Sequence, residues 1–296
     1  MDDATLATLR VIASAIFDIG FAAMAGALST PALLRDASSA WAMRRAWQCR
    51  ALFTAASALT VLASLAWMWV EAMAMTDAPP LAALSEVTRI VADTGFGRAW
   101  AVATLALVVG FVLTRACRFR AMPLRTLALV LVVAAAAHAG TGHAGASGLD
   151  WLLPAMAVHL LATGLWAGSV FGATLVLRGR PDAIDVVRYA RRLSTTATAA
   201  LAAVAATGIA IAWHGLGGSF APLAPASGSA WGFALDAKLA LVALAIALGG
   251  FNRFAAMPSL PATWPRFANV LRVEAAVLLG VLVAAAWLAN GEPPAM

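Results

Sequence analysis

Histidines are the residues of this chain best suited to chemistry, and three of its four histidines lie in one short stretch. The stretch AAHAGTGHAGASGLDWLLPAMAVH covers residues 136–159 and holds His138, His143 and His159 among small and apolar residues. Neutral imidazole is the commonest metal ligand among side chains. The clustering predicts a metal site; the alternative is a group of polar side chains at a wet membrane interface, bonded to loop carbonyls.

The methionines near these histidines suggest which metal the site would take. Met156 precedes His159 by three positions, so both side chains project from one helical face. Imidazole and thioether together form a soft ligand set that suits copper, as Cu(I) or Cu(II), better than magnesium or calcium. The predicted ligands are the residues His143, His159, His138, His214 and Met156.

A second group of methionines lies in the stretch WMWVEAMAM, at Met68, Met73 and Met75. Thioethers on the outer side of the spanned membrane could capture copper before it reaches the histidines. Methionine is also a common apolar filler of protein cores. Both interpretations stay open at this stage.

The elements that must position these side chains are membrane-spanning helices. The chain is 62% hydrophobic and 11% charged, whereas a soluble domain carries about 25% charged residues. Apolar runs of about 20 residues recur, each long enough to cross a hydrocarbon core about 30 Å thick. The pattern predicts an all-α polytopic membrane protein, with one transmembrane domain over residues 1–296. Eight spans are expected, near 6–28, 48–70, 96–114, 124–142, 151–177, 193–214, 231–252 and 268–289.

The positive charges predict how this bundle is oriented. Every basic residue except Lys238 is an arginine, and most arginines follow spans one, three, five and seven. Positively charged connections stay in the cytoplasm, so both termini are expected to be periplasmic and all four histidines to lie toward the outer side. Arginines placed in this way set topology and do not form a nucleic-acid-binding face.

Two further segments complete the expected topology, one at the start of the chain and one before the sixth span. The start, MDDATLATLR, is acidic where a signal peptide is positive, so the first span is expected to be retained. The segment DAIDVVRYARRLS, from residue 182, predicts a short amphipathic helix on the inner surface.

Four polar residues are expected deeper in the membrane: Asp18, Lys238, Asn252 and Glu274. Ionisable residues at such depth usually face the bundle interior and pair with one another. One interpretation is a structural pair of Lys238 with Asp236 or Glu274. The other is a transport path that carries an ion from the outer site to the cytoplasm.

Several motifs resemble those of the copper resistance protein D (CopD) family. GHAGASG is followed by a span containing AVHLLATGLWAGSVF, and further stretches agree in order. These are DTGFGRAW from 93, TGIAIAW from 207, WGFALDAKLALVALAIALGGFNR from 231 and LRVEAAVLLGVLVAAAWLANGEPP from 271, so the resemblance is densest over 138–294.

The resemblance can be carried over residue by residue. His143 matches the family's GH pair, and His159 matches the histidine that opens the next span. Trp166 and Gly168 match a W-x-G motif, Trp213 a family tryptophan, and Lys238, Asn252 and Arg253 a late K…NR pattern. His214 has no family counterpart, and Trp231 stands where the family more often has tyrosine.

The resemblance implies a function in copper handling at the bacterial inner membrane. Proteins of this family are expected to accept copper at a periplasmic histidine and methionine site and move it toward the cytoplasm. A small periplasmic copper-binding protein of the CopC type is the expected partner, and no such domain is fused to this chain. The lipid bilayer is the other partner, nucleic acid is not, and a homo-oligomer stays open.

Two alternatives to transport remain at this stage. The chain could be a copper-binding docking subunit that transports nothing, or a haem b redox protein with paired histidine ligands. No nucleophile with a neighbouring base, zinc protease motif or phosphate-binding loop is present in the sequence, so an enzyme is not expected.

Overall fold

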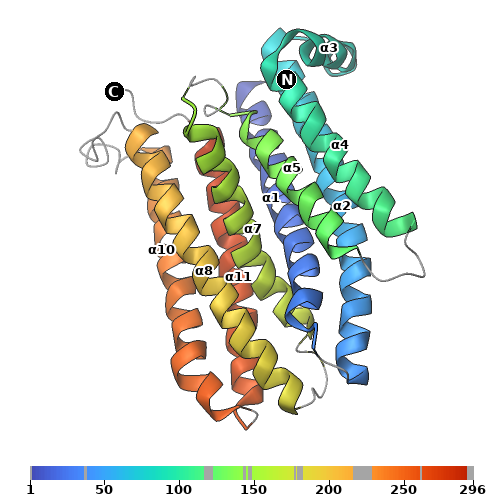
Figure 1. Cartoon of the computed structure of the whole chain (residues 1–296). Coiled ribbons are helices and arrows are strands. Elements are labelled where there is room, and N and C mark those ends of the chain that lie inside the picture. The colour runs from blue at the N-terminus through green and yellow to red at the C-terminus, as the bar shows by residue number, and fades with distance from the viewer. Residues whose placement is uncertain are drawn as a thin grey trace.

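The computed structural model of this chain is a bundle of long helices (Figure 1). It describes residues 2–36, 39–116, 123–142, 145, 149–176, 178, 183–215, 229–260 and 262–291. The α-helices are α1 (Asp3–Leu33), α2 (Ala40–Thr76), α3 (Pro80–Asp93), α4 (Gly95–Ala116), α5 (Leu124–Ala139), α7 (Leu152–Val176), α8 (Ala183–Gly215), α10 (Ala230–Phe251) and α11 (Trp264–Asn290). A π-helical turn, Asn252–Ala256, and a 3-10 turn, Met257–Ser259, follow α10.

Helices occupy all eight predicted spans, which confirms the all-α polytopic architecture. Seven of the described helical segments are long and apolar enough to cross a membrane. The eighth, α5, has 16 residues and is about 24 Å long at 1.5 Å per residue. Helix α1 begins and α11 ends at the same end of the bundle (Figure 1), as an even number of spans requires.

Two parts of the structure differ from the prediction. Helix α3 was not expected; it begins with Pro80 at its first position and is too short to span. It buries Ala83 and Ile90 against α2 and α4, so it covers one end of these two helices.

The segment from 182 is not a separate surface helix, because from Ala183 it is continuous with the sixth span as α8. A surface helix was the wrong inference, since no glycine or proline interrupts residues 183–207.

The centre of the bundle is the crossing of α1 and α7, where two glycines let the backbones touch. A Cβ atom built on Gly168 would lie 2.0 Å from the carbonyl oxygen of Ala22, and one on Gly26 would lie 2.0 Å from that of Gly168. Small residues allow such close approach of helices in membranes. The packing of α7 on α1 fixes the position of its other residues, including His159.

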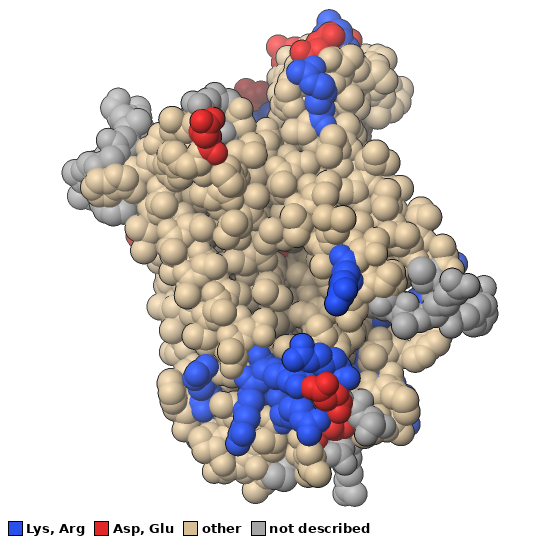
Figure 2. Space-filling view, in the orientation of Figure 1, with Lys and Arg blue, Asp and Glu red and all other residues tan. Residues whose placement is uncertain are grey.

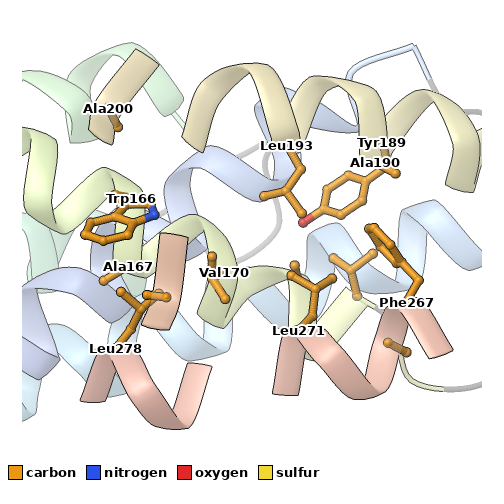
Figure 3. Close-up of a cluster of buried hydrophobic side chains, with 14 of the residues drawn as sticks. Trp166, Ala167, Val170, Tyr189, Ala190, Leu193, Ala200, Phe267, Leu271 and Leu278 are labelled. Carbon is orange, nitrogen blue, oxygen red and sulfur yellow. The ribbon is translucent and has the colours of Figure 1, made fainter. Parts of the chain in front are cut away.

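Apolar clusters lie on both sides of this crossing. One joins α7, α8 and α11 and includes Trp166, Tyr189, Leu271 and Leu278 (Figure 3). Another joins α1, α2, α4 and α5 around Phe53. Outward-facing side chains from the surrounding helices are also apolar, for example Leu62, Leu105, Leu129 and Leu239, as a lipid-facing surface requires.

The charged residues divide between the two ends of the molecule. In Figure 2, basic side chains gather at the end opposite the start of α1, and acidic side chains are seen at the other end. The basic end includes Arg35, Arg188 and Arg192. This is the charge distribution from which the orientation was predicted.

Candidate metal centre

His159 lies in the first half of α7 and faces α8. Its Nδ1 atom is 3.0 Å from the Thr207 hydroxyl. A Cβ atom built on Gly208 would lie 3.1 Å from the His159 Cε1 atom, so the glycine leaves room for the ring. Thr207 and Gly208 together hold the imidazole in one orientation between the two helices.

The hydrogen bonds of Thr207 favour one tautomer of His159. The Thr207 hydroxyl has one hydrogen and lies 2.6 Å from the carbonyl of Ala203, to which it donates. In this arrangement the hydroxyl accepts from His159, which favours the tautomer with the proton on Nδ1. Nε2 then keeps its lone pair, which is the form in which a neutral histidine binds a metal. A hydrogen bond on the other ring nitrogen is the usual second contact of a metal-bound histidine.

One charged residue of another helix acts on this imidazole, and it links the imidazole to a second charge. Lys238 of α10 interacts electrostatically with both His159 and Asp18 of α1. Both Asp18 and Lys238 are half-buried. Lys238 is therefore within electrostatic range of Asp18, and neither of the two predicted partners, exposed Asp236 and buried Glu274, acts on it in the same way.

His138 lies in a different part of the bundle. Its ring stacks on Phe17 of α1, with the centroids 4.3 Å apart, and is tilted against Trp67 of α2 at 5.8 Å. Successive residues of a helix point about 100° apart, so Phe17 and Asp18 project from different sides of α1. His138 packs against the Phe17 side, and Lys238 acts on the Asp18 side. The structure does not bring His138 to His159.

The remaining predicted ligands are placed as follows. His214 is exposed at the end of α8, with its ring edge-on to Trp151 at 5.6 Å. Met156 is half-buried one turn before His159 on α7. His143 lies outside the described residues. Among the residues that the structure does describe, no three histidine, cysteine or acidic side chains gather closely enough to hold a metal.

The methionines expected to capture copper are not gathered at one surface. Met68 and Met73 are buried in the cluster that α2 forms with α3 and α4, where they act as apolar filler. Met75 is 53% exposed. A capture role for these residues stays a prediction.

Two polar residues of the predicted path lie where the end of α10 approaches the first half of α11. Asn252 is buried where α10 passes into its π-helical turn, and its side-chain oxygen and nitrogen have no partner in the described part of the chain. Glu274 of α11 is also buried; its Oε1 atom lies 3.2 Å from where a Cβ atom on Gly249 would be. Local π-helical turns are frequent at functional sites.

Arg253 joins two helices at this same end. Its guanidinium donates to the hydroxyls of Ser194, at 2.9 Å, and Thr198, at 3.1 Å. This contact ties the end of α10 to α8.

Trp166 and Gly168, the W-x-G pair, have packing roles in the structure. Trp166 is buried in the cluster that α7 forms with α8 and α11 (Figure 3), and Gly168 makes the crossing with α1.

Sequence reasoning missed Thr207 and Gly208 as functional residues. Both belong to TGIAIAW, which was recognised as a motif without any role for its first two residues. A threonine followed by glycine within an apolar span was the available signal. What the sequence lacked was the register of α8 against α7, which brings them to His159.

Comparisons with known proteins agree with the resemblance. A family model described as "Copper resistance protein D-like, N-terminal domain" matches residues 1–152, and one described as "Copper resistance protein D" matches residues 187–288. A protein named Copper resistance protein D from Pseudomonas syringae pv. tomato is 30% identical over 264 residues, which are 82% of this chain and 84% of the relative. No solved structure matches the chain. The chain therefore belongs to the copper resistance protein D family.

Proposed function

We propose that this protein carries copper across the bacterial inner membrane, from the periplasm toward the cytoplasm. Copper would first bind on the outer side, at His159 together with Met156 and His143. It acts as a carrier with no catalytic step of its own, and a periplasmic protein of the CopC type would deliver the copper. Membership of the copper resistance protein D family supports a role in copper handling.

One observation carries the choice of His159 as the central ligand. The contact with Thr207 favours the tautomer with the proton on Nδ1, in which Nε2 keeps the lone pair that binds a metal. Met156, one turn away on the same helical face, supplies a thioether that suits Cu(I). Because a neutral histidine and a methionine carry no charge, the bound copper keeps its positive charge, which neighbouring charged groups can then stabilise or repel.

The route inward would follow the polar residues of α1, α10 and α11. Lys238 acts on both His159 and Asp18, Asn252 lies just after α10, and Glu274 lies in the first half of α11 beside Gly249. From Lys238 to Asn252 is 14 residues, or about 21 Å of helix. A cation passing between these two levels would need to be partly hydrated, because charged groups at membrane depth require polar partners.

Uptake into sealed vesicles tests the transport proposal. Purified protein reconstituted in proteoliposomes is expected to accumulate radiolabelled copper, and the double variant His143→Ala/His159→Ala is expected to lose both uptake and stoichiometric copper binding while still inserting. Copper binding without uptake by the wild-type protein would favour the docking subunit. Unchanged copper content in the double variant would overturn the proposed site.

The charges beside His159 should shift its copper affinity in opposite directions. Lys238→Met removes a positive charge that repels the bound cation, so we expect affinity to rise roughly tenfold. Asp18→Asn removes an attractive charge, so affinity should fall by a similar factor. Competition with a chromophoric copper chelator measures both values. Asp236→Asn, on the exposed side of α10, is the matched control; equal shifts in all three variants would contradict the assignment.

A further inference from the structure

The basic end of the bundle holds two adjoining surface grooves, one along the first turns of α8 and the other between the end of α1 and α8. One groove, of about 660 Å³, is lined by residues of α8 that include Ile184, Arg188 and Arg191. The other, of about 400 Å³, lies between Leu33 of α1 and the next turns of α8. Arg191 and Arg192 line both grooves, so the two form one continuous basic surface.

Part of this charge has a structural partner. Arg192 donates to the backbone carbonyl of Leu33 at 3.0 Å and to the carboxylate of Asp36. The hydrogen bond from Arg192 holds the pKa of the Asp36 carboxyl below its ordinary value, so this group stays ionised at neutral pH. Arg188 donates to the backbone carbonyl of Asp36 at 3.1 Å. These contacts fix the grooves by joining α8 to the end of α1.

The positive charge nevertheless exceeds the negative charge at this surface. Arg35, Arg188, Arg191 and Arg192 line the grooves, and Asp36 is the exposed acid bonded to them among the residues that the structure describes here. The side chain of Arg191 is exposed. Guanidinium groups bind phosphate through paired hydrogen bonds, so an excess of arginine favours a phosphate ligand.

The position of the grooves along α8 places them at the membrane surface. Helix α8 has 33 residues and is about 50 Å long, whereas the hydrocarbon core is about 30 Å thick. Its charge-free part runs from Ser194 to Gly215 and is long enough to fill that core. The arginines at 188–192 therefore lie just outside it, at the level of the lipid headgroups.

The lining of the grooves is apolar as well as basic. Ile184 is 70% exposed, and Val187, Ala32 and Leu33 lie beside the arginines. A free phosphate ion would gain nothing from this apolar surface. A phospholipid would place its phosphate among the guanidinium groups and its glycerol and upper acyl chain on the apolar side chains.

We infer that the two adjoining grooves along the start of α8, the smaller of which α1 also lines, bind the phosphate headgroup of an anionic phospholipid of the inner leaflet, with Arg191 as the shared contact. The bound lipid would bridge the end of α1 and the start of α8. This site is separate from the copper path, and its test does not depend on copper binding.

Native mass spectrometry of the full-length protein in detergent tests the lipid site. With phosphatidylglycerol added, the wild-type protein is expected to retain one lipid, and Arg191→Gln should bind it at least about fivefold more weakly, the factor that corresponds to ~1 kcal/mol for one basic residue at the surface. Arg191→Lys should lose less. Arg272→Gln, an equal loss of charge at an exposed position of α11, should bind as the wild type does.

Further measurements test both the type of ligand and the position of the site. Phosphatidylcholine, which has no net charge, should be retained more weakly than phosphatidylglycerol. Inorganic phosphate at the same concentration should not displace the lipid. Equal lipid binding by Arg191→Gln and Arg272→Gln would overturn the site, and displacement by inorganic phosphate would overturn the lipid assignment. Arg188→Gln gives a second test of the larger groove if Arg191→Gln fails to fold.

Discussion

The Thr207→Val variant is expected to bind copper about 10- to 100-fold more weakly than the wild-type protein. Valine keeps the size of the side chain but removes the hydroxyl that accepts the hydrogen of His159 Nδ1. Without this contact the imidazole can rotate or take the other tautomer, in which Nε2 carries the proton and has no free donor pair. Competition titration with a copper chelator, on protein that remains monodisperse, gives the affinity.

Two variants serve as controls for Thr207→Val, one at the same position and one at another threonine of α8. Thr207→Ser keeps the hydroxyl and should stay within a few-fold of the wild-type affinity. Thr195→Val makes the same chemical change toward the inner end of α8, where the hydroxyl bonds only locally to the carbonyl of Arg191. An affinity of Thr207→Val equal to that of Thr195→Val would show that Thr207 does not orient a ligand.

The Gly168→Ala variant is expected to be markedly less stable than the wild-type protein. The added Cβ atom would lie 2.0 Å from the carbonyl oxygen of Ala22, so α1 and α7 would have to separate. Overpacking of this kind costs up to about 3 kcal/mol, and the clash is with backbone, which cannot rotate away. Heating the purified protein and following the monodisperse fraction by size-exclusion chromatography measures the loss.

Substitution of a second glycine, away from the crossing, shows whether the loss of stability results from the contact between α1 and α7. Gly250 lies at the end of α10, and a Cβ atom built on it meets no atom within 4 Å. Gly250→Ala is therefore expected to be as stable as the wild type or slightly more stable, because alanine favours helix over glycine. Equal stability of the two variants would mean that the close approach of α1 and α7 is not required.

The spans and their order were predictable because apolar length and arginine position each depend on local sequence. The presence of α3 was not, since PLAALSEVTRIVAD is neither long nor apolar enough to span. Its helical register emerges only when Ala83 and Ile90 are packed against α2 and α4. The continuation of α8 from Ala183 was missed for a similar reason: its polar and apolar parts were treated as two elements.

The candidate site was predictable in its residue types but not in its geometry. Spacing along the chain placed His138, His143 and His159 together, yet His138 packs against Phe17 and Trp67, away from His159. Chain proximity cannot reveal on which side of α1 a neighbouring helix packs. Conversely, Thr207 is 48 residues from His159, and only the packing of α8 on α7 brings the two into contact.

The crossing at Gly168 also affects how natural variation in this family should be interpreted. Every other amino acid carries a Cβ atom, so any relative that keeps this backbone contact must keep glycine there. Selection for assembly alone would then preserve the W-x-G motif as strictly as selection for metal binding preserves a ligand. A ranking of positions by invariance would place Gly168 beside His159, although one residue joins two helices and the other is the proposed contact with copper.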